Sequence, residues 1–282
     1  MWGLIKMVSI REITPAEAPV LSAMSDSVNW NVSANECALL TTAENMRGFF
    51  LEADGEIAGS AGMVTYEPSS LVFINLVIVK PEFRRRGYAT MLIEHILKVT
   101  ENYRTKKLHA TPEGSVVYAP LGFKPCRTIS FFSAQNPVLS DPGNVDVHTM
   151  SDAEFEAAVE ADAGYFGFNR RNLLEFSRRE NPALALAAPG GHIFGRRWKR
   201  FRQMAGLYSN DFNTAVALAA AAAKLDQSQP QSIITYDMQK DFQEFLLDGG
   251  FTKTREMLDM EFGENTPEPP MGYRAIYGGD MG

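Results

Sequence analysis

The apolar and polar positions change in period along the chain, and this pattern predicts alternating strands and helices. The run Leu71–Val79 is rich in Val, Ile and Phe, which indicates a buried strand. Pro81 ends the run, because proline lacks the N–H group that a strand ladder needs. The amphipathic stretch Met91–Thr100 follows and is typical of a helix.

Local signals define the elements on either side of this strand. Thr14, Pro15 and Glu17 have the order of a helix start, with Thr at the N-cap, Pro at N1 and Glu at N3. The Asp54-Gly55 pair between two apolar stretches predicts a hairpin. The first half is therefore expected to run β-α-α-β-β-β-α-β-α-β. Its other elements are strands at Val8–Ile13, Lys107–Ala110 and Arg127–Ser133, a helix to about Met24, one within Asn29–Ala43 and one at Ser115–Ala119.

A polar segment, Gln135–Asn144, contains two prolines and a glycine and is typical of a linker. The pattern after it resembles the first half: Gly55-x-Ile57-x-Gly59 is echoed by Gly191-x-Ile193-x-Gly195, and Gly122-Phe123 by Gly250-Phe251. We expect two mixed α/β domains, residues 1–136 and residues 145–282. The second is expected to contain strands at 145–148, 183–188, 192–198, 202–208, 232–237 and 254–262, helices from 151, at 214–224 and at 241–247, and a tail, 272–282, over its sheet.

Composition narrows the class of protein. A length of 282 residues suits two domains, and an apolar content of 45% suffices for a sizeable core. The net charge of −7 argues against a general nucleic-acid binder. Cys37 and Cys126 form neither a disulfide framework nor a zinc spacing, so we expect a reducing, cytoplasmic location and no metal. The sequence has no apolar run of membrane-spanning length, so no membrane partner is expected.

The segment Arg84-Arg85-Arg86-Gly87-Tyr88-Ala89 opens the helix after the buried strand. The first amides of a helix lack partners within it, and the helix dipole favours negative charge there. Gly87 has no side chain to keep an anion away from the backbone. Three arginines before a helix N-terminus are locally unfavourable, which indicates an anionic partner.

Two motifs in this order resemble the GCN5-related N-acetyltransferases (GNAT family). One is Arg84-x-x-Gly87-x-Ala89, preceded by Val79-x-Pro81, and the other is Tyr118-x-x-x-Gly122-Phe123. The resemblance implies two GNAT domains, each a mixed, mostly antiparallel sheet flanked by helices, the second a degenerate copy. It also implies transfer of an acetyl group from acetyl-CoA to a primary amine of a small molecule or peptide, directly within a ternary complex.

The resemblance also assigns roles to residues. The loop at the helix start would hold the pyrophosphate of acetyl-CoA, the preceding strand would pair with the pantetheine arm, and Tyr118 would protonate the leaving thiolate as general acid. Thr111 stands where many members have an asparagine that contacts the coenzyme. The coenzyme-binding residues expected on this basis are Val77, Ile78, Val79, Arg84, Arg85, Arg86, Gly87, Tyr88, Ala89, Thr90 and Thr111.

The general base is not defined by the resemblance. Phe73 stands where the protein-lysine members carry a glutamate, Asn75 cannot act as a base, and Glu67 and Glu113 are loop carboxylates that could orient a water. The alternative reading of Tyr118 is a core tyrosine. The four histidines have no ligand spacing and are expected to be structural.

The second half lacks the Arg-x-x-Gly-x-Ala motif and carries Asp211 in its place, which repels a pyrophosphate. We therefore expect one coenzyme per chain, bound to the first half. A chain that ends near Asn144 is expected to keep that binding. The second half would wall an acceptor pocket between the halves, with Asp162, Arg170 and Arg171 near the acceptor.

Two other functions stay open at this point. A coenzyme-binding but inactive domain could act as a sensor or scaffold, which the missing glutamate favours. A nucleic-acid binder could use the basic run Arg196–Arg202 with its interleaved Trp198 and Phe201. The simpler interpretation of that run is a hairpin strand and turn with one solvated face.

Overall fold

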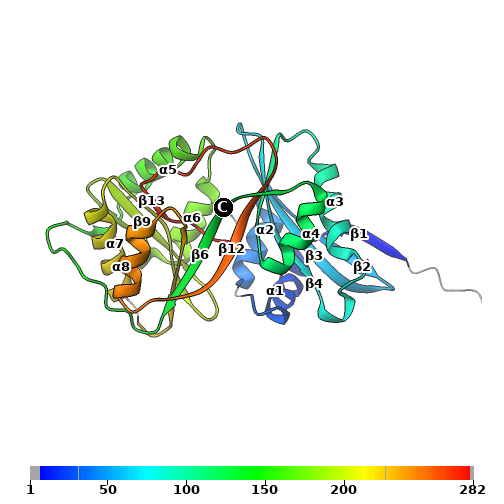
Figure 1. The fold of residues 1–282 in the computed structure, drawn as a ribbon, viewed down its shortest axis with the longest axis horizontal. Helices are drawn as coiled ribbons and strands as arrows, with labels where there is room; N and C mark the ends of the chain where they lie inside the picture. Colours follow the sequence, from blue (N-terminus) through cyan, green and yellow to red (C-terminus); the bar gives the residue numbers. More distant parts are fainter. Residues whose placement is uncertain (1–6, 31, 226, 280–282) are drawn as a thin grey trace, which may run out of the picture.

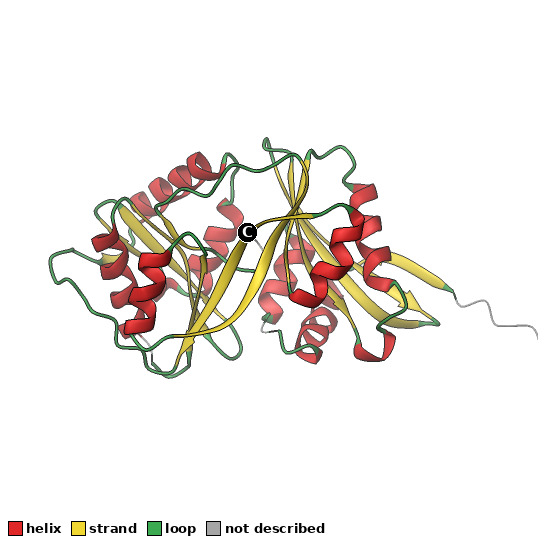
Figure 2. Ribbon diagram, in the orientation of Figure 1, coloured by secondary structure: helices red, strands yellow, loops and turns green. Residues whose placement is uncertain are grey.

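The structure is a computed structural model that describes residues 7–30, 32–225 and 227–279. Figure 1 shows two lobes, each a part of one sheet with helices packed on it, which meet at two long central strands. These strands are β6 (Lys124–Ala134) and β12 (Thr252–Gly263). Figure 2 shows the mix of helices and strands in both lobes, which confirms the α/β class.

The elements have the following bounds. The other strands are β1 Val8–Glu12, β2 Met46–Ala53, β3 Glu56–Tyr66, β4 Leu71–Val79, β5 Thr105–Ala110, β7 His148–Thr149, β8 Leu186–Ala188, β9 Gly191–Arg197, β10 Arg202–Ser209, β11 Gln231–Tyr236 and β13 Tyr273–Ala275. The α-helices are α1 Ala18–Ser27, α2 Ala34–Thr42, α3 Tyr88–Val99, α4 Pro112–Tyr118, α5 Asp152–Phe166, α6 Arg171–Glu180, α7 Phe212–Leu225 and α8 Lys240–Asp248.

The predicted element order of the first half is confirmed. The Glu17 carboxylate accepts a hydrogen bond from the Thr14 backbone N–H at 3.0 Å, as the capping pattern requires. The Asp54-Gly55 turn joins the antiparallel strands β2 and β3. In the second half the strand expected at 145–148 is reduced to β7, a two-residue strand at the outer edge of the sheet. The predicted tail contributes β13, and residues 280–282 lie outside the described part.

The sheet is continuous through both halves because β6 of the first half and β12 of the second half each pair with strands of the other half. Its order is β1-β2-β3-β4-β5-β12-β6-β11-β10-β9-β8-β7, with β13 beside β10. Strand β12, from the end of the chain, lies between β5 and β6, and β6 in turn pairs with β11. The division of the chain into two domains at residues 137–144 stays a prediction. The pairing argues against the expectation for a chain ending near Asn144, because such a chain lacks the strand between β5 and β6.

The basic run Arg196–Arg202 forms the β9–β10 hairpin with one solvated face, as predicted, because Arg197, Lys199 and Arg200 are exposed. Arg196 is buried, and its Nη2 lies 2.6 Å from Oε1 of the buried Glu36 on α2. Lys199 Nζ pairs with Asp26 of α1 at 2.7 Å. The hairpin therefore holds the second half against the first, and the charges of Arg196 and Lys199 are used within the protein, which weakens the nucleic-acid hypothesis. Arg202 is also buried and donates from Nη2 to the Ala222 carbonyl at 2.7 Å.

A buried charge cluster fixes β12 between its two neighbours. Asp259 is opposite His109 of β5 and Arg127 of β6 in the ladders. Its Oδ2 lies 3.0 Å from Lys107 Nζ and 2.9 Å from Arg127 Nη1. Burial alone would raise the pKa of Asp259, but the adjacent Lys107 and Arg127 cations outweigh it and hold that pKa below its usual value.

The depressed pKa makes the contribution of Asp259 dependent on pH. A carboxylate whose pKa is lowered by folding stabilises the protein above its unfolded pKa, about 3.9, and loses this effect as pH falls through the lower folded value. We expect Asp259→Asn to lower the free energy of unfolding at pH 7 by up to about 3 kcal/mol, because Lys107 and Arg127 lose the nearer of their two carboxylate partners and keep only Glu261. The difference from the parent should shrink below about pH 4, in urea unfolding followed by circular dichroism.

Glu12→Gln is the matched control, because Glu12 pairs with Arg47 at 2.9 Å on the exposed surface of the same lobe. Such a pair is worth at most about 1 kcal/mol. Equal losses for the two variants at pH 7 would contradict the role given to Asp259.

Candidate active site

Strands β4 and β5 separate halfway along their length. Their parallel pairing runs from Leu71 opposite Thr105 to Ile74 opposite Leu108 and then ends. At this point Leu76 has a positive φ of 46°, and the Ser60 hydroxyl donates to its carbonyl at 3.0 Å. The β3–β4 register shifts between Ser60 and Gly62. This bulge turns β4 away from β5, so the β5-facing backbone edge of 77–79 has no partner in the described ladders.

The N-terminus of α3 begins at the end of that open edge. Gly87 is its N-cap residue with a φ of 80°, a conformation that favours glycine, and a Cβ there would meet nothing within 4 Å. Arg84 donates from Nε to the Val79 carbonyl at 3.2 Å, which ties the loop to the strand. Arg86 turns back, donates to the Glu82 carbonyl at 2.9 Å and lies over the Phe83 ring. The strand–turn–helix context predicted from the sequence is thus present.

A cleft of about 640 Å³ joins the open strand edge to the helix start. All but one of the predicted coenzyme residues line it, and so does Tyr118. Arg86 is the exception, in keeping with its turn away from the cleft. The predicted residues along the wall are Val77, Ile78, Val79, Arg84, Arg85, Gly87, Tyr88, Ala89, Thr90 and Thr111.

Tyr118 lies at the end of this cleft. The residue is 8% exposed, and burial raises the pKa of its phenol, so the group is protonated at neutral pH. Among the described residues, no group hydrogen-bonds to its hydroxyl, which leaves that O–H free for a ligand. Its ring packs near Phe123 and against Gly114, where an added Cβ would come within 3.0 Å of the ring. Packing therefore fixes the ring while the hydroxyl stays available.

Thr111 is the N-cap residue of α4, the helix that contains Tyr118. Its hydroxyl accepts a hydrogen bond from the Gly114 N–H at 3.1 Å and so caps α4. The residue also lines the cleft. Thr111 therefore orients Tyr118 through α4, whatever contact it makes with a ligand.

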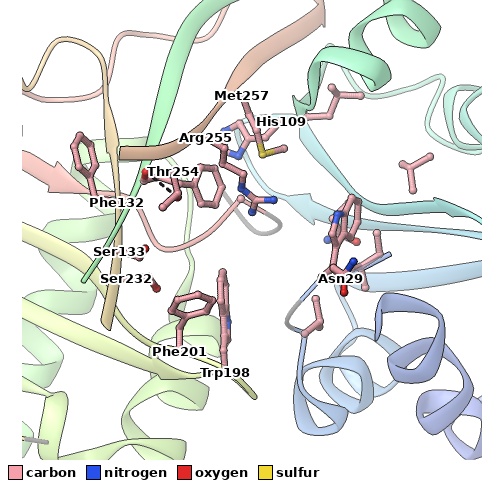
Figure 3. Close-up of a pocket in the computed structure, with 18 of the residues that line it drawn as sticks. Asn29, His109, Phe132, Ser133, Trp198, Phe201, Ser232, Thr254, Arg255 and Met257 are labelled. Carbon is pink, nitrogen blue, oxygen red and sulfur yellow. Dashed lines mark hydrogen bonds between the residues drawn. The ribbon is translucent and has the colours of Figure 1, made fainter. Parts of the chain in front are cut away.

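A second cavity of about 240 Å³ adjoins the cleft and lies between the two halves (Figure 3). Trp30, Val77, His109 and Tyr118 line both spaces. The second half contributes the hairpin residues Trp198 and Phe201 together with Ser232 and Gly279, and the central strands contribute Phe131, Phe132, Ser133, Thr254, Arg255 and Met257. A cavity with walls from both halves is thus present as expected.

The residues expected beside the acceptor do not line this cavity. Asp162 and Arg170 are buried and pair with each other, with Nε and Oδ2 2.9 Å apart, and Arg170 also donates to the Tyr273 hydroxyl. Arg171 is on the surface with Glu156 and Glu175. An internal ion pair already uses the charge of Asp162. Arg170 lines a further cavity of about 310 Å³ beside His109, so the place of these residues near the acceptor stays a prediction.

The candidates for a general base are also resolved in position. Phe73 packs edge-on against His109, with ring centroids 5.0 Å apart. Glu113 is an exposed residue at the wall of the 640 Å³ cleft, and Glu67 lines a separate cavity beside Arg170. The His109 side chain is fully buried, with Nε2 3.6 Å from Asp259 Oδ1. Within the described residues, no carboxylate lines the cavity between the halves.

The corresponding position in the second half is filled by the protein itself. Strands β10 and β11 separate after Met204 opposite Ile233, near Gly206 with its φ of 56°. Strand β13 pairs with β10 beyond that point, and the Ile276 N–H donates to the Ile234 carbonyl at 2.9 Å. Asp211 accepts from the Thr214 N–H at 2.9 Å, so a carboxylate already occupies the N-terminus of α7.

Metal ligands and membrane-spanning helices are the last two features considered for the described residues. These residues contain no group of three or more His, Cys, Asp or Glu side chains that could hold a metal ion. None of the helices in the described part of the chain is both long and apolar enough to cross a membrane.

Comparisons with known proteins extend this description. Residues 9–119 match the family model described as "Acetyltransferase (GNAT) family". An uncharacterized N-acetyltransferase, YitH, of Bacillus subtilis is 24% identical over 127 residues, which are 45% of this chain and 44% of that protein. The chain thus matches less than half the length of this curated relative.

Solved structures resemble the chain over almost its full length. A putative acetyltransferase from Pyrococcus horikoshii has a TM-score of 0.80 at 19% identity, with 98% of this chain and 96% of that chain covered. A GCN5-related N-acetyltransferase from Sphaerobacter thermophilus has a TM-score of 0.65 at 16% identity, with 91% and 95% covered. At these identities the likeness shows the fold. Residues 9–119 therefore match the GNAT acetyltransferase family, and the whole chain has a GNAT-like fold.

Proposed function

We propose that the protein transfers an acetyl group from acetyl-CoA to a primary amine of a small molecule or peptide. The observation that carries this proposal is the 640 Å³ cleft, where the α3 N-terminus, the open edge of 77–79 and Tyr118 meet. The free helix amides suit the pyrophosphate. The strand edge offers backbone groups to the amide-bearing pantetheine arm, as a further strand would. Tyr118 stands where the thioester would end.

The chemistry follows from these groups. The neutral amine attacks the thioester carbonyl carbon, a C–N bond forms and the C–S bond breaks. A backbone N–H in 77–79 would stabilise the negative charge that develops on the carbonyl oxygen. The leaving thiolate takes a proton from the Tyr118 hydroxyl, which burial keeps protonated. The amine nitrogen then releases a proton, and this proton restores the phenol of Tyr118.

A dedicated side-chain base is not part of the proposal. The His109 side chain is buried beside Asp259, and in the described residues the cavity between the halves has no carboxylate. We infer that the amine loses its proton to water before attack. Because this needs no glutamate on β4, Phe73 is compatible with activity, and the inactive-sensor alternative loses its main support.

One coenzyme per chain is expected. The second half keeps the strand separation, but β13 and Ile276 occupy it, and Asp211 caps the helix where a pyrophosphate would bind. Both changes oppose a second coenzyme.

Gly87→Glu tests the coenzyme site. The new side chain would point into the open space at the helix start and place a carboxylate against the pyrophosphate. We expect acetyl-CoA affinity to fall by at least about tenfold, since like charges in contact cost several kcal/mol. Isothermal titration calorimetry should show about one binding site per chain in the parent.

Gly143→Glu is the matched control, because Gly143 also has a positive φ, of 72°, with nothing within 4 Å of an added Cβ, and lies in the predicted linker. Two equivalents of coenzyme in the parent, or parental affinity in a folded Gly87→Glu variant, would contradict the assignment.

Tyr118→Phe tests the general acid. The variant keeps the packed ring and loses the proton donor, so turnover should fall by roughly 10²-fold while acetyl-CoA affinity is nearly unchanged. Release of free thiol at saturating amine measures the rate. Tyr103→Phe controls for loss of a phenol outside the cleft in the same lobe. An unchanged rate for Tyr118→Phe would return this residue to a purely structural role.

A further inference from the structure

We propose that the acetyl acceptor is a small amine that carries a carboxylate beside an aromatic or apolar side chain, and that Arg255 binds this carboxylate. The inference rests on the proposed acetyl transfer and names the class of its acceptor. It uses the cavity between the halves, whose walls include Tyr118 and Val77 of the coenzyme cleft.

The walls of this cavity are mainly aromatic. Trp30 comes from the first half, Trp198 and Phe201 from the β9–β10 hairpin, and Phe131 and Phe132 from β6. Figure 3 shows Trp198 and Phe201 below Arg255, with Asn29 across the cavity. Such rings offer apolar area with little loss of conformational entropy, so they suit an aromatic or apolar side chain.

Arg255 gives the cavity its charge. Its guanidinium carbon lies 3.9 Å from the centroid of the Phe131 ring, so one face is stacked and the N–H groups at its edge stay available. Within the described residues, Arg255 has no hydrogen bond or ion pair, whereas Lys253 on the same strand pairs with Glu256. Arg255 is an exposed residue, but the protein beside it still lowers its pKa by desolvation, which an anionic ligand would offset.

The remaining polar groups favour the same class of ligand. Asn75 Oδ1 and Ser232 Oγ are buried in the wall without a hydrogen-bond partner in the described part of the chain. Because the described wall has no carboxylate, it offers nothing to attract a polycation, and a single arginine matches one carboxylate in a bidentate pair.

The size of the cavity points to a single small molecule. Its 240 Å³ lies below the range of roughly 300–1,000 Å³ typical of drug-sized ligands. This volume and the aromatic walls together indicate a molecule of the size of an aromatic or apolar amino acid.

Two matched probes test this inference on the full chain: L-phenylalanine and L-phenylalaninamide, which differ in the carboxylate. Calorimetry in the presence of coenzyme A measures binding, and thiol release from acetyl-CoA measures transfer. We expect L-phenylalanine to bind more tightly than the amide. Arg255→Gln should weaken L-phenylalanine binding by roughly 10- to 100-fold, the size expected for a hydrogen bond to a charged group, and should leave amide binding unchanged.

Lys253→Gln is the matched control, because it removes a cation from the same strand outside the cavity wall. Arg255 has no structural ion pair to lose, so the variant should fold, and its acetyl-CoA affinity should equal that of the parent. The amines of L-phenylalanine and L-phenylalaninamide differ in basicity. Each probe is therefore compared between parent and variant, so that this difference cancels.

The outcomes separate the inference from the proposed function. Binding of L-phenylalanine that depends on Arg255, without thiol release from this or any other amine, would support the carboxylate site at Arg255 and overturn the proposed transfer. Tighter binding of the amide, equal effects of Arg255→Gln on both probes, or no binding of either probe would overturn the inference. Acetylation of amines that lack a carboxylate, in any of these cases, would leave the proposed transfer intact.

Discussion

The antiparallel pairing of β6 with β12 is the interaction on which the rest of the structure depends. It joins β6 of the first half and β12 of the second half, each of which also pairs with a strand of the other half. It also places Asp259 between His109 and Arg127. Met257 and Arg255 reach the cavity between the halves from the same strand. Because these residues enter from the end of the chain, neither half on its own has a complete sheet or a complete cavity.

In both halves two parallel strands separate at a residue with positive φ, but the space between the strands is used differently. In each, a residue with positive φ, Leu76 or Gly206, lies where a parallel strand pair separates. In the first half the gap leads to the open N-cap at Gly87. In the second half β13 fills the gap and Asp211 caps the helix. The backbone hydrogen-bonding groups of an open strand edge and of a helix N-terminus need partners, from a ligand or from the chain itself. The first half leaves them to a ligand, and the second half supplies them from the chain.

The sequence predicted the local features well, because they depend on neighbouring residues. The strand that ends before Pro81, the Thr14 capping pattern and the Asp54-Gly55 hairpin are all confirmed. The sequence predicted a strand at 254–262 within the second half, yet β12 also pairs with β5 of the first half, and Asp259 is buried there. No local pattern reveals that a strand will lie between two strands from another half, so the roles of Asp259 and Arg255 could not be predicted.

The arginines of this fold differ in how their charge is satisfied. Arg170 pairs with Asp162 and Arg196 with Glu36, whereas the buried Arg202 donates to the Ala222 carbonyl. Such a partner is the usual requirement for a charge removed from water. Arg255 stacks on Phe131 at the wall of the cavity, and the described residues give it no carboxylate. Arg255 is an exposed residue, so water satisfies its charge until a ligand in the cavity displaces that water, and a carboxylate on the ligand would then take the place of the water.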